Sequence, residues 1–255
     1  MSYLAGAVAL LSGGCFVVLG AVALWELLRE RGRRGFSQFG TSLCAMLLIC
    51  GAFHLAYAAY AVRGAGSFSL LVSAATLLGT VPVAAFTLLR VEALRGGRGD
   101  RFVDGTPSWL RVAPWALVFI AGMLAAGSIH TALTRGAELW AVWPPLVLML
   151  NLAAVGWLMV RAQARRRESS GGWSLAGVTL ATTFAASAVV HATMAADGGP
   201  GVVLFTIDVA GVPASAWFLL STARLYRSSL QDWNRRPLVG RPRPTRRPSP
   251  WASRA

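Results

Sequence analysis

The chain contains three histidines, His54, His130 and His191, and each lies in a long apolar segment, a few residues before the next polar loop. An ionisable side chain is costly to place in hydrocarbon, so one found there is a candidate for function. Imidazole nitrogen binds copper, zinc and iron, including haem iron, and it also carries protons near neutral pH. The repeated spacing leads to the hypothesis that the histidines belong to one site.

Three other side chains lie where they can join such a site. Cys50 precedes His54 by four residues and Met194 follows His191 by three, so each is expected on the helix face of its histidine. Asp208 reaches the same depth from the opposite direction, as a ligand or as the acceptor that fixes an imidazole tautomer. Apolar packing is the alternative for the two sulfur side chains. The candidate metal ligands are His54, His130, His191, Asp208, Met194 and Cys50, with copper favoured by the sulfur atoms over haem or zinc.

Seven apolar segments carry these residues, each long enough to cross about 30 Å of hydrocarbon as a helix. They span 3–28, 38–62, 67–90, 110–134, 138–160, 173–196 and 201–223. Because lipid cannot satisfy backbone polar groups, each segment is expected to be α-helical. The expected fold is therefore all-α, with a seven-helix transmembrane domain over 1–227 and a disordered tail over 228–255 that is rich in arginine and proline.

The arginines set the expected orientation. All 24 basic residues are arginine, and most follow the first, third and fifth segments or lie in the tail. By the positive-inside rule the N-terminus is outside and the tail is cytoplasmic, where it can bind anionic lipid or a signalling partner. The net charge of +14 does not indicate nucleic-acid binding, because no soluble domain carries it.

The chain has an internal repeat centred on the histidines. Small residues precede the histidine in "CGAFHLAYAAYAVRG", "LAAGSIHTALTRG" and "AASAVVHATMAADGG". A short loop and a second apolar segment follow each string, and that segment ends at Arg90, Arg161 or Arg224. The pattern predicts one leading helix plus three helical hairpins of the same orientation, unlike the inverted repeats of many transporters.

From about 38 to 226 this organisation resembles the MHYT sensor family, whose members contain three pairs of helices with a Met-His-Tyr/Phe motif and a nearby methionine at the outer end of each first helix. "VVHATMAA" is similar to that motif, with His191 and Met194 at the matching places. "SIHTAL" and "AFHLAY" match only at His130 and His54, and other residues replace the flanking methionine and aromatic. The resemblance implies a sensor in a bacterial plasma membrane that binds copper and, through it, oxygen, carbon monoxide or nitric oxide.

Other functions can use the same residue types. A transporter or proton-coupled carrier would use the histidines and Asp208 as a proton relay, and a structural protein would use them only to link helices. A retinal Schiff base is excluded because the chain has no lysine. No serine–histidine–acid triad, phosphate-binding loop or thiol pair occurs. Membrane terpene cyclases generally need more than one deep carboxylate, and Asp208 is alone, so an enzyme is not the favoured interpretation.

Other intramembrane positions are expected to serve packing. Glu26 is expected to reach the membrane surface or to pair with Arg29, three residues further on. Asn151 is expected to form a hydrogen bond between helices. The glycines of "LSGG" and "LGAVALW" predict a close approach of the first helix to a neighbour.

Overall fold

The protein is described here by a computed structural model. Its described residues are 2–34, 37–63, 70–100, 102–104, 108–134, 139–170, 172–196 and 201–235. Within these ranges the chain forms seven helices and two short strands. The helices are α1 (Ser2–Arg34), α2 (Gln38–Arg63), α3 (Leu70–Leu94), α4 (Ser108–Thr134), α5 (Leu139–Ser170), α6 (Leu175–Ala196) and α7 (Val202–Arg235).

Six helices of the described chain, α1, α2, α3, α5, α6 and α7, are long and apolar enough to cross a membrane. This finding supports a multi-pass membrane protein whose helices contact the lipid bilayer. The span expected over 110–134 coincides with α4, and that seventh crossing stays a prediction, as does the orientation. Helix α7 continues to Arg235, past the start expected for the tail at 228; residues 236–255 of that tail lie outside the described residues.

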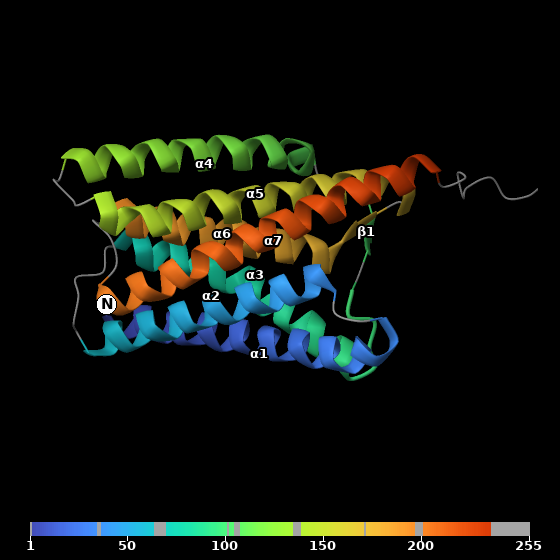
Figure 1. Cartoon of the computed structure of the whole chain (residues 1–255), viewed down its shortest axis with the longest axis horizontal. Helices are drawn as coiled ribbons and strands as arrows, with labels where there is room; N and C mark the ends of the chain where they lie inside the picture. Colours follow the sequence, from blue (N-terminus) through green and yellow to red (C-terminus); the bar gives the residue numbers. More distant parts are fainter. Residues whose placement is uncertain are drawn as a thin grey trace, which may run out of the picture.

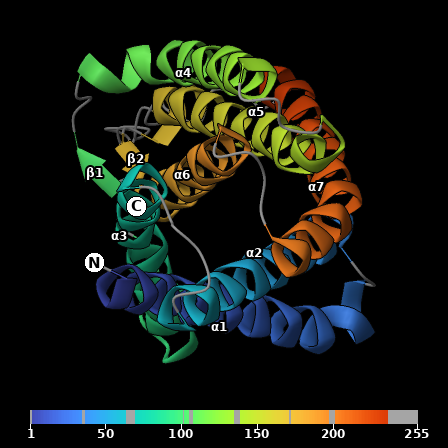
Figure 2. The ribbon, with the colours of Figure 1, turned by 90° about the vertical axis from the view of Figure 1, so that its left-hand side faces the viewer.

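The helices lie side by side along the long axis of the molecule (Figure 1). The C-terminal ends of α1, α3, α5 and α7 lie together, at the right in Figure 1. This end, which carries Arg29, Arg90, Arg161 and Arg224, is called the arginine-rich end below. Seen along the axis, α6 lies at the centre of the bundle and α4 at its periphery, where α4 packs against α5 and α6 (Figure 2).

A small antiparallel sheet joins two loops at the arginine-rich end. Strand β1 (Phe102–Asp104) pairs with β2 (Gly172–Ser174), with Val103 opposite Trp173. Just before β1, the carboxylate of Asp100 accepts hydrogen bonds from Ser174 Oγ at 2.7 Å and from the backbone N–H of Ala176 at 3.0 Å. These contacts satisfy donors at the start of α6, which a helix cannot satisfy by itself.

A glycine seam brings α1 and α2 together. Gly6, Gly13 and Gly20 repeat every seven residues on α1. The residues of α2 nearest to them are, in the same order, Val62, Leu55 and Leu48. A Cβ atom on Gly13 would lie only 2.9 Å from the Leu55 side chain, and one on Gly20 only 2.6 Å from Leu48. The predicted close approach is confirmed, and it places the large α2 side chains in the gaps left by the glycines.

The core of the bundle consists of aromatic and aliphatic side chains. Phe16, Leu148, Phe184 and Phe218, from α1, α5, α6 and α7, are all almost completely buried in one cluster. Within a membrane such side chains stabilise the bundle through close packing rather than through removal from water.

Asn151 on α5 donates a hydrogen bond from Nδ2 to Ser215 Oγ on α7 at 2.9 Å, which confirms the predicted link between helices. The expected pairing of Glu26 with Arg29 is wrong. Glu26 instead forms an ion pair with Arg90 of α3, and the Arg29 guanidinium lies over the Trp25 ring at 5.3 Å from its centroid. Packing of α1 against α3 brings a second arginine to the depth of Glu26.

Candidate functional site

His191 and Asp208 form a buried pair between α6 and α7. His191 lies near the end of α6 and Asp208 lies in the second turn of α7, so the two helices bring them to one depth. Nδ1 of His191 lies 3.4 Å from Oδ1 of Asp208, and the side chains are 5% and 1% exposed. The contact is within ion-pair range, but it is not aligned as a hydrogen bond.

His54 lies beside this pair on α2. Its ring stacks on Phe16 of α1, with ring centroids 5.4 Å apart and planes 7° from parallel. Phe53 meets His54 edge-on at 5.6 Å and contacts His191 at 4.8 Å, so one phenyl ring contacts both imidazoles.

Polar atoms of all three residues are buried without a hydrogen-bond partner among the described residues. They are Nδ1 of His54, Nδ1 of His191 and both carboxylate oxygens of Asp208. An unpartnered buried polar group costs about 1–3 kcal/mol, and more when it is charged. Such atoms can bind a cation or share a proton, so this group of residues, called the His–Asp site below, can do chemistry that the surrounding apolar core cannot.

The two sulfur side chains lie in the apolar packing around the His–Asp site. Cys50 belongs to the core cluster with Phe16, and its side chain lies near Asp208. Met194 is buried in a second cluster with Phe53. Their placement fits both expectations, apolar packing and ligation, so their role as ligands stays a prediction.

His130 does not join the His–Asp site. It is exposed on the peripheral helix α4, whereas Ser128, two residues earlier, faces α6 and donates a hydrogen bond from Oγ to the carbonyl of Ala192 at 2.9 Å. The structure thus brings His54, His191 and Asp208 together and leaves His130 on the outer surface of the bundle. In the part of the chain that is described, no three His, Cys, Asp or Glu side chains are gathered closely enough to hold a metal ion.

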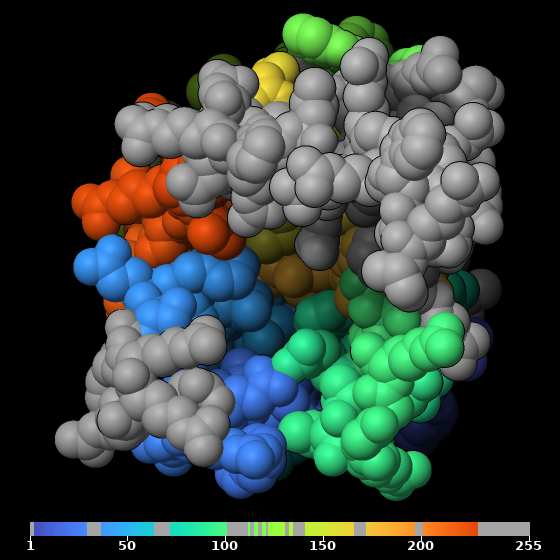
Figure 3. Space-filling model, turned by 90° about the vertical axis from the view of Figure 1, so that its right-hand side faces the viewer, coloured from blue at the N-terminus to red at the C-terminus, as the bar shows by residue number. Residues whose placement is uncertain are grey.

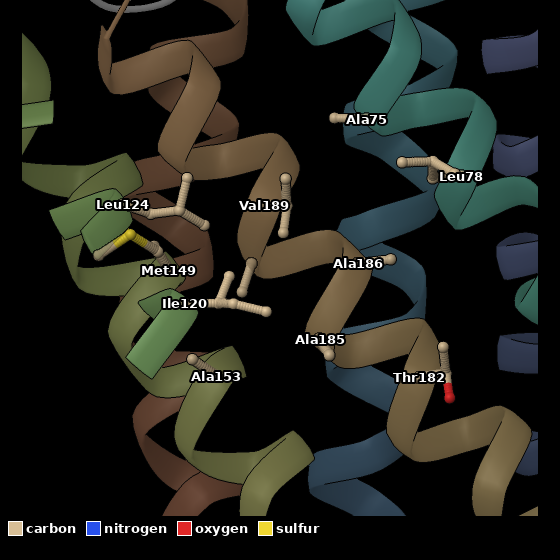
Figure 4. A pocket seen from close by; sticks show the side chains of 11 residues that line it. Ala75, Leu78, Ile120, Leu124, Met149, Ala153, Thr182, Ala185, Ala186 and Val189 are labelled. Atoms are coloured by element: carbon tan, nitrogen blue, oxygen red, sulfur yellow. The ribbon is translucent and has the colours of Figure 1, made fainter. Parts of the chain in front are cut away.

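An apolar pocket of the bundle lies apart from the His–Asp site. It has a volume of about 290 Å³ and lies between α3, α4, α5 and α6 (Figure 4). Thr182 is the one polar residue in its lining, and the Thr182 hydroxyl donates to the carbonyl of Val178 at 2.8 Å. The pocket therefore offers no free polar group, and it carries no chemistry of its own.

Sequence reasoning missed the aromatic surroundings of the His–Asp site. Phe16 lies on the first helix, far from His54 in sequence, and only the packing of α1 on α2 brings the rings together. Phe53 has a local signal, because it directly precedes His54. A phenylalanine in an apolar segment is nevertheless ordinary, and nothing in its spacing predicts contact with His191.

The fold and the site together define a multi-pass membrane protein with a buried polar group near one end of its helix bundle. No family model, curated protein or solved structure matches this chain. The similarity to the MHYT family, which rests on the sequence motifs, therefore stays a proposal.

Proposed function

We propose that this protein is a membrane sensor that binds a transition-metal ion at the His–Asp site, with copper favoured over zinc or haem. The observation that supports this function is the set of unpartnered polar atoms on His54, His191 and Asp208, buried in membrane-spanning helices. Imidazole and carboxylate are common ligands of such ions, and the sulfur atom of Met194 would favour copper(I).

A metal ion explains more of the site than a proton does. A proton shared between His191 and Asp208 would satisfy one contact and would leave Nδ1 of His54 without a partner. One metal ion can be bound by both imidazoles and by the carboxylate. Because the described residues hold no ready set of three ligands, binding requires these side chains to turn toward each other. The stacking of His54 on Phe16 places most of that movement on His191 and Asp208.

Such a movement can report binding at a distance. The ligands belong to three helices, α2, α6 and α7, so a bound ion would change how these helices pack. Helix α7 continues from Asp208 to Arg235 at the arginine-rich end, past the start of the basic tail at residue 228. In the proposed orientation, in a bacterial plasma membrane, that end is cytoplasmic and meets a signalling partner or anionic lipid.

A second function, a proton-coupled carrier, is favoured by one specific observation. The His191–Asp208 pair lies at 3.4 Å, and the described part of the protein gathers no third ligand around it. An imidazole and a carboxylate at that distance can exchange a proton after a small rotation, and intramembrane pairs of this kind serve as relays in transporters.

Metal loading of three variants tests the sensor. Detergent-purified protein is supplied with copper(I), zinc or haem, and bound metal is measured by elemental analysis and absorption. We expect near-stoichiometric copper in the native protein and its loss in His54→Ala and Asp208→Asn. His130→Ala is the matched control, because this exposed histidine should leave copper binding unchanged.

Two outcomes contradict the sensor. Folded native protein that binds no metal would rule it out, and copper that persists in both site variants would place the metal elsewhere. The relay is tested separately in liposomes, by proton flux under an imposed pH gradient. Flux that disappears in Asp208→Asn, in a protein that binds no metal, would establish the second function instead.

A further inference from the structure

Two adjoining cavities lie at the arginine-rich end, which faces the viewer in Figure 3. The deeper one is lined by α1, α2, α3 and α6, and the outer one lies between the ends of α1 and α3. The deeper cavity has a volume of about 400 Å³ and is mostly apolar. It runs inward from Glu26 and Arg90 to Leu19 and Leu47, which is about 10 Å along α1 at 1.5 Å per residue. The outer cavity, of about 330 Å³, shares Glu26 with the deeper one.

The charges around these cavities leave an excess of positive charge. The ion pair of Glu26 with Arg90 links α1 to α3, and both side chains are partly exposed, at 40% and 32%. Arg29 lines the outer cavity and lies over the Trp25 ring. Because Arg90 neutralises Glu26, the charge of Arg29 is left over for a ligand. An apolar cavity with a cation at its mouth is complementary to an anionic amphiphile.

We propose that this pair of cavities binds one anionic phospholipid, with an acyl chain in the deeper cavity and the phosphate beside Arg29 and Arg90. A lipid is favoured over a soluble anion because the cavity walls belong to membrane-spanning helices, so acyl chains surround them. Tryptophan and arginine are typical of the interface where lipid headgroups lie. The binding site is thus placed on the helix bundle itself, separate from the basic tail and from the His–Asp site.

Fluorescence quenching by brominated lipid tests the site. Full-length protein in phosphatidylcholine nanodiscs is titrated with phosphatidylglycerol that carries bromine on its acyl chains, and tryptophan emission is recorded. Trp25→Phe isolates the signal of Trp25, which lines the outer cavity, from that of the other tryptophans. We expect half-maximal quenching of Trp25 at about fivefold less brominated phosphatidylglycerol than brominated phosphatidylcholine.

Three variants locate the binding. Arg29→Gln leaves the ion pair intact and should abolish the preference for the anionic lipid. Arg224→Gln, which changes an exposed arginine of the same end bonded to Gln38, is the matched control and should keep it. Ala23→Phe fills the deeper cavity and should weaken quenching by either lipid.

Equal quenching by the two lipids would overturn the proposal, as would a preference that survives Arg29→Gln. Quenching unchanged by Ala23→Phe, in a variant with native thermal stability, would show that no acyl chain enters the deeper cavity and would overturn it as well.

Discussion

Replacement of Gly13 by alanine tests the seam between α1 and α2. The new Cβ would lie 2.9 Å from the Leu55 side chain and 3.1 Å from the backbone nitrogen of Leu55. The side chain can rotate away, but the backbone atom cannot, so α1 must move outward by a few tenths of an ångström. Overpacking of this kind typically costs about 1–3 kcal/mol. Alanine favours the helix over glycine by about 1 kcal/mol, so we expect a net loss of up to about 2 kcal/mol.

Gly14→Ala is the matched control, because no atom lies within 4 Å of a Cβ at that position. It should leave the free energy of unfolding unchanged or raise it by up to about 1 kcal/mol. The assay is thermal unfolding of both variants in one detergent, followed by circular dichroism. Leu55→Ala added to Gly13→Ala should recover part of the loss by relieving the side-chain contact. Equal unfolding temperatures for the Gly13 and Gly14 variants would refute the close-packed seam.

Two other predictions concern polar contacts. Asp100→Ala removes the acceptor of hydrogen bonds from Ser174 and Ala176, so it should lower the free energy of unfolding by about 1–2 kcal/mol. It should also speed amide hydrogen exchange at the start of α6, and unchanged exchange there would contradict the capping role. Asn151→Ala should lower the free energy of unfolding by about 0.6–1.7 kcal/mol. A double-mutant cycle with Ser215→Ala should assign most of that loss to the hydrogen bond between the two side chains. Strictly additive losses would show that the bond contributes nothing.

The helices were largely predictable because hydrocarbon imposes their length. The segment expected over 38–62 is α2, Gln38–Arg63, and its end at an arginine marks where the apolar run stops. The ends of α5 and α7 were not predictable in this way. Both helices continue beyond the apolar run, to Ser170 and Arg235, because hydropathy reports where lipid contact ends and not where backbone hydrogen bonding ends.

The depth of the candidate site followed from counting residues, but its membership did not. His54, His130 and His191 have similar sequence surroundings, a few residues before the next polar loop, yet only His130 is exposed. In a soluble helix, an apolar stripe would show which side faces the core. Membrane helices are apolar on every side, because one side meets lipid and the other meets neighbouring helices, so the sequence does not indicate which way each histidine points.

The sequence also does not indicate which arginine pairs with Glu26 at the arginine-rich end. The spacing of Glu26 and Arg29 suggests a local pair, since residues three apart share a helix face. Arg90 is 64 residues away in sequence but lies at the same depth on α3, and it is the partner that Glu26 takes. Arg29 is held by the Trp25 ring instead.

The α1–α2 seam and the His–Asp site can form at different stages of biosynthesis. The α1–α2 seam joins neighbouring helices, so this hairpin can form as soon as both are in the membrane, and N-terminal parts of a chain generally fold first during synthesis. The His–Asp site needs α2, α6 and α7, and among the described helices α7 is the last to be made. A nascent chain that stops before Asp208 already carries both buried histidines but has no carboxylate beside His191. The His–Asp site is therefore complete only once α7 has packed against the earlier helices.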